Sequence, residues 1–122
     1  MEDEKKILVV WLSEREKPFV EVLVEYLSEE VSCFHIEGRG MEKFYENPFE
    51  ENESFSVIIL TTMDMLHHGK VLMKLYSDAK IIIVSSLVSQ DIFKDENGIT
   101  FIKKSSRDVF RHILKEVQTS NN

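Results

Sequence analysis

The sequence predicts an α/β domain of the doubly wound type, in which helices cover both faces of a parallel β-sheet. Five short apolar runs support this prediction, at residues 7–12, 31–36, 57–60, 81–84 and 99–102. Each run has the length of a strand, and segments that can be helical separate the runs. The first run is apolar throughout, as expected of a central parallel strand that is covered on both faces.

A helix is predicted directly after the first strand. Ser13 and Glu16 fit a capping box, and Pro18 suits the first helical turn, where its missing N–H costs little. The buried face of this helix follows a 3.6-residue period: Phe19, Val20, Leu23, Val24 and Leu27. The opposite face carries an acidic row: Glu21, Glu25 and Glu29.

The next stretch contains one strand and few other strong signals. Residues 31–36 form the second predicted strand, and residues 37–40 form a turn. A short helix around residues 41–45 ends before Pro48, because the residue before a proline avoids helical geometry. Residues 46–53 form an acidic loop that we expect to be exposed.

The second half of the chain supplies three more strands. These strands cover residues 56–62, 80–85 and 99–103, with helices predicted at 70–77 and 88–94 between them. A turn at Asn97 and Gly98 precedes the last strand. Ser105 or Ser106 is expected to cap a final helix, whose apolar stripe comprises Val109, Phe110, Ile113, Leu114 and Val117.

The composition indicates a globular protein and disfavours several functions. At 122 residues and 43% apolar content, one domain with one core is the simplest arrangement. No apolar run approaches the roughly 20 residues of a membrane helix, and the first residues contain no apolar signal core. The single cysteine, Cys33, falls in an apolar strand and suits the reducing cytoplasm. A net charge of −7 disfavours nucleic acid, which needs a basic surface.

The joint spacing of Thr61, Gly69, Ser85 and Lys104 adds a family resemblance. Five β/α units of this kind, with a hydroxyl residue ending the fourth strand and a lysine ending the fifth, resemble the receiver domain of bacterial response regulators. The resemblance covers nearly the whole chain. It implies a flavodoxin-like fold with a five-stranded parallel sheet in the order 2-1-3-4-5 and helices on both faces.

The departures from that family change the expected chemistry. Receivers hold Mg²⁺ with two acidic residues after the first strand, where this chain has Trp11 and Leu12. They accept phosphate on an aspartate after the third strand, where this chain has Thr61. Ser85 and Lys104 match the remaining hydroxyl and lysine, although the proline after the lysine is replaced by Ser105. The resemblance therefore implies an atypical receiver, often called a pseudo-receiver, that works without phosphorylation, Mg²⁺ or another cofactor.

Two side-chain groups could in principle carry other chemistry. A hydroxyl–lysine nucleophile built from Thr61, Ser85 and Lys104 would need a neutral lysine, so a hydrogen-bonded cluster is the simpler expectation. The adjacent His67 and His68 have no third ligand nearby in the sequence, which favours loop polarity over a metal site. We therefore expect neither a catalytic residue nor a metal.

The expected function is protein–protein interaction, with a partner protein or a second copy of the chain. The resemblance points to the face that receivers form from their fourth and fifth helices, and the candidate residues on it are Phe93, Lys103, Arg107, Arg111 and Lys115. The last three form a basic stripe that can be simply solvated or can meet the acidic row of the first helix, within one molecule or between two. The alternative function is a small flavodoxin-fold enzyme or cofactor carrier, although residues 11–14 make a poor phosphate loop.

Overall fold

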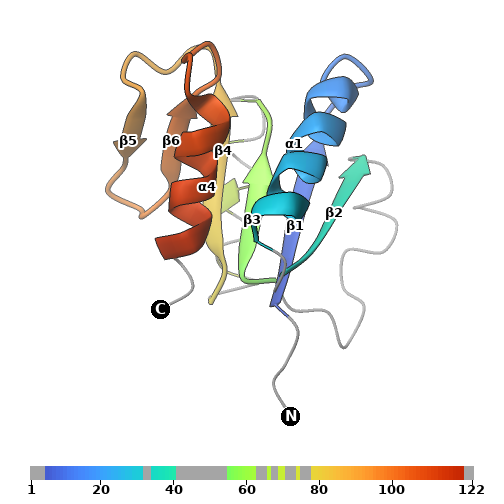
Figure 1. The fold of residues 1–122 in the computed structure, drawn as a ribbon. Coiled ribbons are helices and arrows are strands. Elements are labelled where there is room, and N and C mark those ends of the chain that lie inside the picture. Colours follow the sequence, from blue (N-terminus) through green and yellow to red (C-terminus); the bar gives the residue numbers. More distant parts are fainter. Residues whose placement is uncertain are drawn as a thin grey trace.

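The computed structural model describes residues 5–31, 34–40, 55–62, 66, 69, 70, 74 and 78–119. Within this part of the chain the protein forms one mostly parallel six-stranded sheet in the order β2-β1-β3-β4-β6-β5 (Figure 1). The strands are β1 (Lys5–Trp11), β2 (Phe34–Gly40), β3 (Val57–Leu60), β4 (Lys80–Ser85), β5 (Ile92–Lys94) and β6 (Thr100–Lys103). The two fully described helices are α1 (Lys17–Glu30) and α4 (Val109–Thr119).

The predicted flavodoxin-like fold is confirmed. Strands β2, β1, β3, β4 and β6 are parallel, and their order corresponds to the predicted 2-1-3-4-5. The predicted number of five strands is wrong, because β5 adds a sixth, antiparallel strand beside β6.

The helix predicted over residues 88–94 is also wrong. Residues 92–94 form β5, with Phe93 opposite Phe101 and their ring centroids 5.9 Å apart. The turn between the two strands is held by the Asp95 carboxylate, which accepts hydrogen bonds from the backbone N–H groups of Asn97 (3.0 Å) and Ile99 (2.9 Å). Gly98 has a φ of 89°, a conformation that glycine adopts without strain. These contacts favour a hairpin over a helix.

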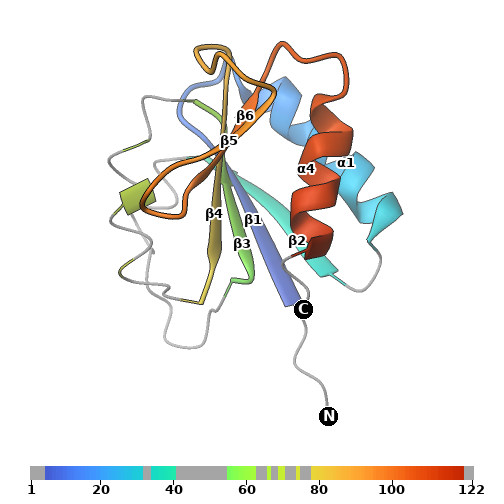
Figure 2. The same ribbon diagram turned by 90° about the vertical axis from the view of Figure 1, so that its left-hand side faces the viewer.

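One face of the sheet is covered by α1 and α4, which Figure 2 shows side by side. Phe110 of α4 contacts both Phe19 and Tyr26 of α1, with centroids 5.5 Å apart in each pair. The core below the two helices contains the predicted helical stripes and alternate strand residues: Ile7, Val9, Val20, Leu23, Leu27, Val57, Ile59, Ile82, Val84, Ile102, Ile113 and Val117. The apolar faces predicted for the first and last helices are therefore confirmed.

The opposite face buries alternate strand side chains together with Ile99, which precedes β6: Leu8, Val10, Ile58, Leu60, Ile81, Ile83, Ile99 and Phe101. Helical residues lie over it, since Leu66 packs against this cluster and a Cβ on Gly69 would lie 3.3 Å from Leu60 Cδ1. Of the helix predicted over residues 70–77, Lys70 and Lys74 are described and both are helical. Cys33, the short helix at 41–45 and the loop at 46–53 lie outside the described residues.

The helix N-termini differ from the predicted caps. Helix α1 begins at Lys17 after Glu16, which makes no side-chain cap hydrogen bond. Ser13 instead starts a turn: its carbonyl accepts the Glu16 N–H at 3.0 Å, and its hydroxyl donates to Glu16 Oε2 at 2.6 Å. The predicted capping box is therefore wrong, because this turn separates Ser13 from the helix.

Helix α4 begins later than expected. The His112 N–H donates to the Asp108 carbonyl (2.9 Å), which makes Asp108 the residue before the first turn, in place of Ser105 or Ser106. At the other end, Lys80 Nζ donates to the Glu116 carboxylate and carbonyl and to the Thr119 hydroxyl. A cation at this end complements the helix dipole. No helix among the described residues is long and apolar enough to cross a membrane.

Candidate functional site

The carboxyl ends of the central strands converge at one edge of the sheet, as parallel pairing requires. The register places Val10 of β1 beside Leu60 of β3, so Thr61 follows directly beside the end of β1. Ser85 of β4 pairs with Lys103 of β6, and the Lys104 N–H donates to the Ser85 carbonyl at 2.9 Å. The sequence thus located these predicted site residues at the correct edge.

Thr61, which the resemblance matches to the acceptor aspartate of receivers, has a side chain that is buried with 1% exposure. Its hydroxyl donates a hydrogen bond to the Val10 carbonyl at 3.0 Å. The hydroxyl proton is therefore engaged in joining the ends of β3 and β1. Ser85 is similarly buried, and its hydroxyl oxygen accepts the N–H of Leu87 at 3.1 Å, which holds the turn after β4.

Trp11, which the resemblance matches to the first metal-binding acid of receivers, lies against β2. A Cβ on Gly40 would lie 3.0 Å from the indole Nε1, and one on Gly38 would lie 3.2 Å from the indole Cζ3. These glycines are strand residues of β2, so the turn predicted over residues 37–40 is wrong. Glycine inside a strand often marks such a close approach of another group, and here it admits the indole ring.

The next position, Leu12, is exposed and equally unable to bind a hard cation. Among the described residues, no cluster of three or more histidine, cysteine or acidic side chains could hold a metal ion. The adjacent His67 and His68 lie outside the described residues.

Lys104 does not reach the other receiver-like residues by a hydrogen bond. Its ammonium lies 4.8 Å from the ring centroid of Phe19 at the start of α1, within the range of a cation–π interaction. In the described part of the chain, no hydrogen bond joins Lys104 Nζ to Thr61 or Ser85. The three side chains share one edge of the sheet but act in separate structural contacts.

An ion pair that the sequence analysis missed lies on β2. The Nε of Arg39 donates to Glu37 Oε2 at 2.7 Å, and the guanidinium lies 5.7 Å from the centroid of Phe55. This hydrogen bond lowers the pKa of the Glu37 carboxyl below its ordinary value of 4.5, against a smaller opposing effect of burial. Side chains two residues apart on a strand lie on the same face of the sheet. The spacing of Glu37 and Arg39 in a strand would therefore have predicted this ion pair.

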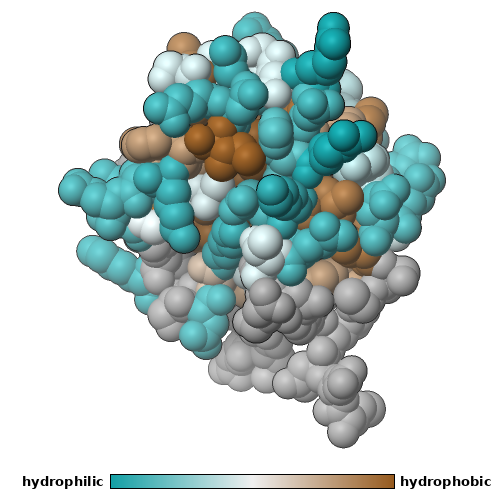
Figure 3. All heavy atoms as spheres, turned by 60° about the vertical axis from the view of Figure 1, so that its left-hand side comes forward, coloured by the Kyte–Doolittle hydropathy of each residue, from teal (hydrophilic) through white to brown (hydrophobic). Residues whose placement is uncertain are grey.

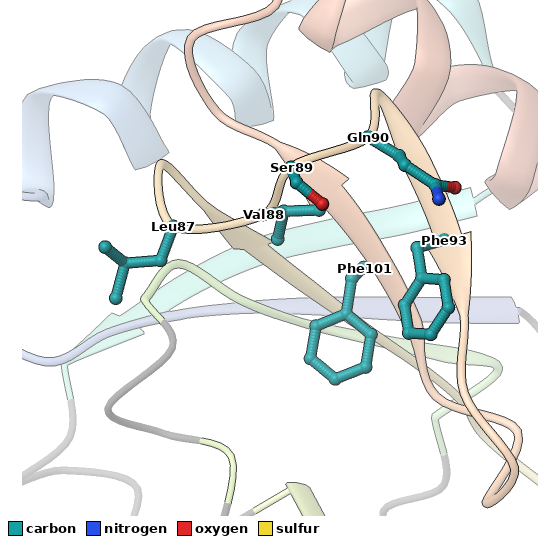
Figure 4. A pocket seen from close by; sticks show the side chains of 6 residues that line it. All are labelled: Leu87, Val88, Ser89, Gln90, Phe93 and Phe101. Atoms are coloured by element: carbon teal, nitrogen blue, oxygen red, sulfur yellow. The ribbon is translucent and has the colours of Figure 1, made fainter.

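A pocket of about 300 Å³ lies between the turn after β4 and the hairpin (Figure 4). The described residues that line it are Leu87, Val88, Ser89, Gln90, Phe93 and Phe101. Leu87 is 76% exposed and Phe93 46% exposed, so the opening carries apolar surface. Figure 3, which brings the β5 side forward, shows apolar patches set among hydrophilic side chains. Phe93 was predicted as an interaction residue, whereas the other lining residues were not, because the pocket depends on the hairpin, which the sequence did not reveal.

The other predicted interaction residues lie on three different elements. Lys103 ends β6 and is half-buried, with its N–H bonded to the Asp91 carbonyl at 2.9 Å. Arg107 is exposed in the turn before α4, so the basic stripe does not lie wholly on the helix. Arg111 and Lys115 are exposed on α4 itself.

Comparisons with known proteins agree with this architecture. No family model matches the sequence, and no curated protein matches it significantly. A response regulator from Thermotoga maritima is 15% identical, with a TM-score of 0.64 over 97% of this chain and 98% of that one. A fragment of a putative lipoprotein from Peptoclostridium difficile 630 is 11% identical, with a TM-score of 0.68 over 97% of this chain and 99% of that one. At these identities the likeness concerns the fold alone, and the fold is receiver-like.

Proposed function

We propose that this protein is a receiver-like signalling module that acts by binding another protein and does not depend on phosphorylation. The observation that carries the proposal is Thr61. A receiver needs a carboxylate nucleophile that faces solvent and a metal, whereas Thr61 is a buried hydroxyl bonded to the Val10 carbonyl. Such a hydroxyl can neither form an acyl phosphate nor leave its hydrogen bond without cost.

The surroundings of Thr61 support the same function. Mg²⁺ prefers oxygen ligands in octahedral geometry, and Trp11 and Leu12 offer apolar side chains at the corresponding positions. The lysine that would neutralise a phosphoryl group, Lys104, lies over Phe19 instead. Thr61 and Ser85 hold strand ends and turns, and Trp11 and Lys104 pack against neighbouring elements. Signalling would therefore depend on the outer surface of the domain.

The surface proposed for a partner protein combines apolar and basic groups. Phe93 and Leu87 are exposed beside the 300 Å³ pocket, and Arg107 and Arg111 are exposed at the start of α4, which covers the other face of the sheet, so a partner that contacts both groups would span the edge formed by β5. Aromatic anchors in pockets with a charged rim are typical of protein interfaces. A cytoplasmic location is part of the proposal, supported by the single cysteine of the chain.

The test is exposure to a small acyl-phosphate donor with Mg²⁺, followed by mass spectrometry of the intact protein. We expect no phosphoryl adduct on the wild type. Thr61→Asp alone should also stay unmodified and bind no Mg²⁺ in calorimetry, because the metal ligands are still missing. The triple variant Trp11→Asp, Leu12→Asp and Thr61→Asp is the matched gain-of-function control. A stoichiometric, alkali-labile phosphoryl adduct on the wild type would overturn the proposal.

The alternative, a small flavodoxin-fold enzyme or cofactor carrier, rests on the fold alone. It is checked by the absorbance and the mass of the natively purified protein, which would reveal a retained flavin or nucleotide. We expect neither.

A further inference from the structure

We propose that the face formed by α1 and α4 binds the same face of a second copy of this chain, with α1 of each copy against α4 of the other. The inference names a partner for the α4 part of the proposed interaction surface, and to that extent it rests on the proposed function. The evidence is the arrangement of charge on two neighbouring helices.

The two helices lie side by side on one face of the sheet (Figures 1 and 2). Their contact is an aromatic seam, in which Phe110 touches both Phe19 and Tyr26. Val22 lies one turn before Tyr26 on the same side of α1 and is 51% exposed. Leu114, one turn after Phe110, is half-buried. An apolar strip therefore reaches the surface between the helices.

Each helix carries charge of one sign on its outer side. Residues Glu21, Glu25 and Glu29 are exposed at intervals of four on α1, opposite the buried Val20, Leu23 and Leu27. On α4, Arg111 and Lys115 are exposed opposite the buried Ile113 and Val117, and Arg107 continues the row in the preceding turn.

The two rows do not neutralise each other within one molecule. Both helices lie wholly within the described residues, and no ion pair there connects the acidic row to Arg107, Arg111 or Lys115. The ion pair that α4 does make joins Glu116 to Lys80 of β4. Glu116 is half-buried and lies outside the basic row. Both rows therefore remain available to an external partner.

The heights of the charges along the helices also match. Phe110 contacts Phe19 and Tyr26, so it lies at a level between them. At a rise of about 1.5 Å per residue, Arg111 then falls between Glu21 and Glu25, and Lys115 falls one turn further along. Each base is offset by only about 2 Å from the level of an acid, well within the reach of these long side chains.

This pattern selects one symmetry. In a two-fold dimer the same patch meets itself, so every contact occurs twice. A two-fold axis that runs along the helices brings the acidic row of one copy onto the basic row of the other, in both directions. An axis across the helices would bring Glu25 against Glu25 and Arg111 against Arg111, which is repulsive. The charges therefore favour α1 against α4 of the partner, with the apolar strips in the centre.

The experiment measures the dimer by sedimentation equilibrium and uses three double variants. Arg111→Glu with Lys115→Glu makes the face mostly acidic, and Glu21→Lys with Glu25→Lys makes it mostly basic. Lys70→Glu with Lys74→Glu is the matched control, because both lysines are exposed and belong to the helical segment over the other face of the sheet. Circular dichroism confirms that each variant is folded.

We expect the wild type and the control to dimerise at low salt, with a dissociation constant that weakens about tenfold as salt rises from about 0.05 to 0.5 M. The acidic and the basic variant should each remain monomeric alone and form a heterodimer when mixed, because each row again faces its opposite. Restored pairing in the mixture cannot result from misfolding.

Two results would overturn the proposal. One is a wild type that stays monomeric at about 0.1 mM in low salt. The other is a mixture of the acidic and basic variants that fails to associate while both are folded. Neither result would affect the proposed function, since absence of phosphorylation and binding of a different protein are measured separately.

Discussion

Thr100, at the start of β6, has a buried hydroxyl that finds no hydrogen-bond partner among the described residues. The side chain is 1% exposed. A buried polar group without a partner loses its hydration and gains nothing in return. Replacing Thr100 with valine removes the hydroxyl while keeping the shape, so we expect this substitution to raise the free energy of unfolding.

The magnitude follows from the environment of the side chain. An unsatisfied buried hydroxyl costs about 1–3 kcal/mol. Threonine and valine are both branched at Cβ and both suit a strand, so backbone preference changes little. Allowing for imperfect fit of the new methyl group, we expect a gain of about 1–2 kcal/mol. For a chain of this size, that corresponds to a rise in Tm of roughly 3–10 °C.

Thr61 provides the matched control. It is equally buried at 1% exposure, but its hydroxyl donates to the Val10 carbonyl at 3.0 Å. Thr61→Val should therefore lower the free energy of unfolding, by about 0.5–1.5 kcal/mol. Urea unfolding followed by circular dichroism measures both variants. A destabilised Thr100→Val, or a shift of the same sign in both variants, would refute the reasoning.

The other predictions concern an ion pair, a turn and a strand–helix junction. The pKa of the Glu37 carboxyl is lowered in the folded protein, so Glu37 stabilises the fold above its ordinary pKa of 4.5. This stabilisation is lost as the pH falls through the lower pKa of the folded state. Arg39→Gln should raise the pKa of Glu37, measured by NMR titration, and remove this loss of stability in acid. Gly98→Ala should cost about 1–2 kcal/mol in urea unfolding, because φ is 89° there, and an unchanged midpoint would contradict the assigned turn. Lys80→Met should destabilise by about 1–2 kcal/mol, since it leaves the half-buried Glu116 carboxylate unpaired, and the double variant Lys80→Met with Glu116→Gln should recover part of the loss in the same assay.

The core of the fold was accessible from the sequence because its strands are buried on both faces. Residues 57–60 were predicted as a strand from their apolar run alone, and they form β3 with all four side chains buried. The second strand was misplaced for two reasons. Val31 is apolar because it ends α1 against the core, and Gly38 and Gly40 resemble a turn although they make room for Trp11.

The hairpin was missed because β5 has only three residues. A run as short as residues 92–94 has no period that separates a strand from a helix. The turn at Asn97 and Gly98 was predicted correctly, but its role in pairing β5 with β6 depends on the Asp95 carboxylate, a contact that becomes visible only in three dimensions.

The candidate site shows the same division. Topology brings strand ends together, so the placement of Thr61 and Ser85 at one edge of the sheet followed from the order of elements. The direction of each side chain did not follow. Whether Lys104 turns toward Thr61 or toward Phe19 depends on its rotamer and on the packing of α1, which no local pattern in the sequence encodes.

The short strand β5 has a consequence for the edge of the sheet. Without it, β6 would be the outermost strand, and Thr100–Lys103, three of whose four residues are buried, would offer unpaired backbone groups to other chains. β5 pairs with that strand and ends the sheet after only three residues, with exposed Lys94 and Asp91 at its two ends. A short, charged border is a poor template for further strand addition. The hairpin therefore shields this side of the sheet from strand addition, and removing β5 should increase aggregation through β6.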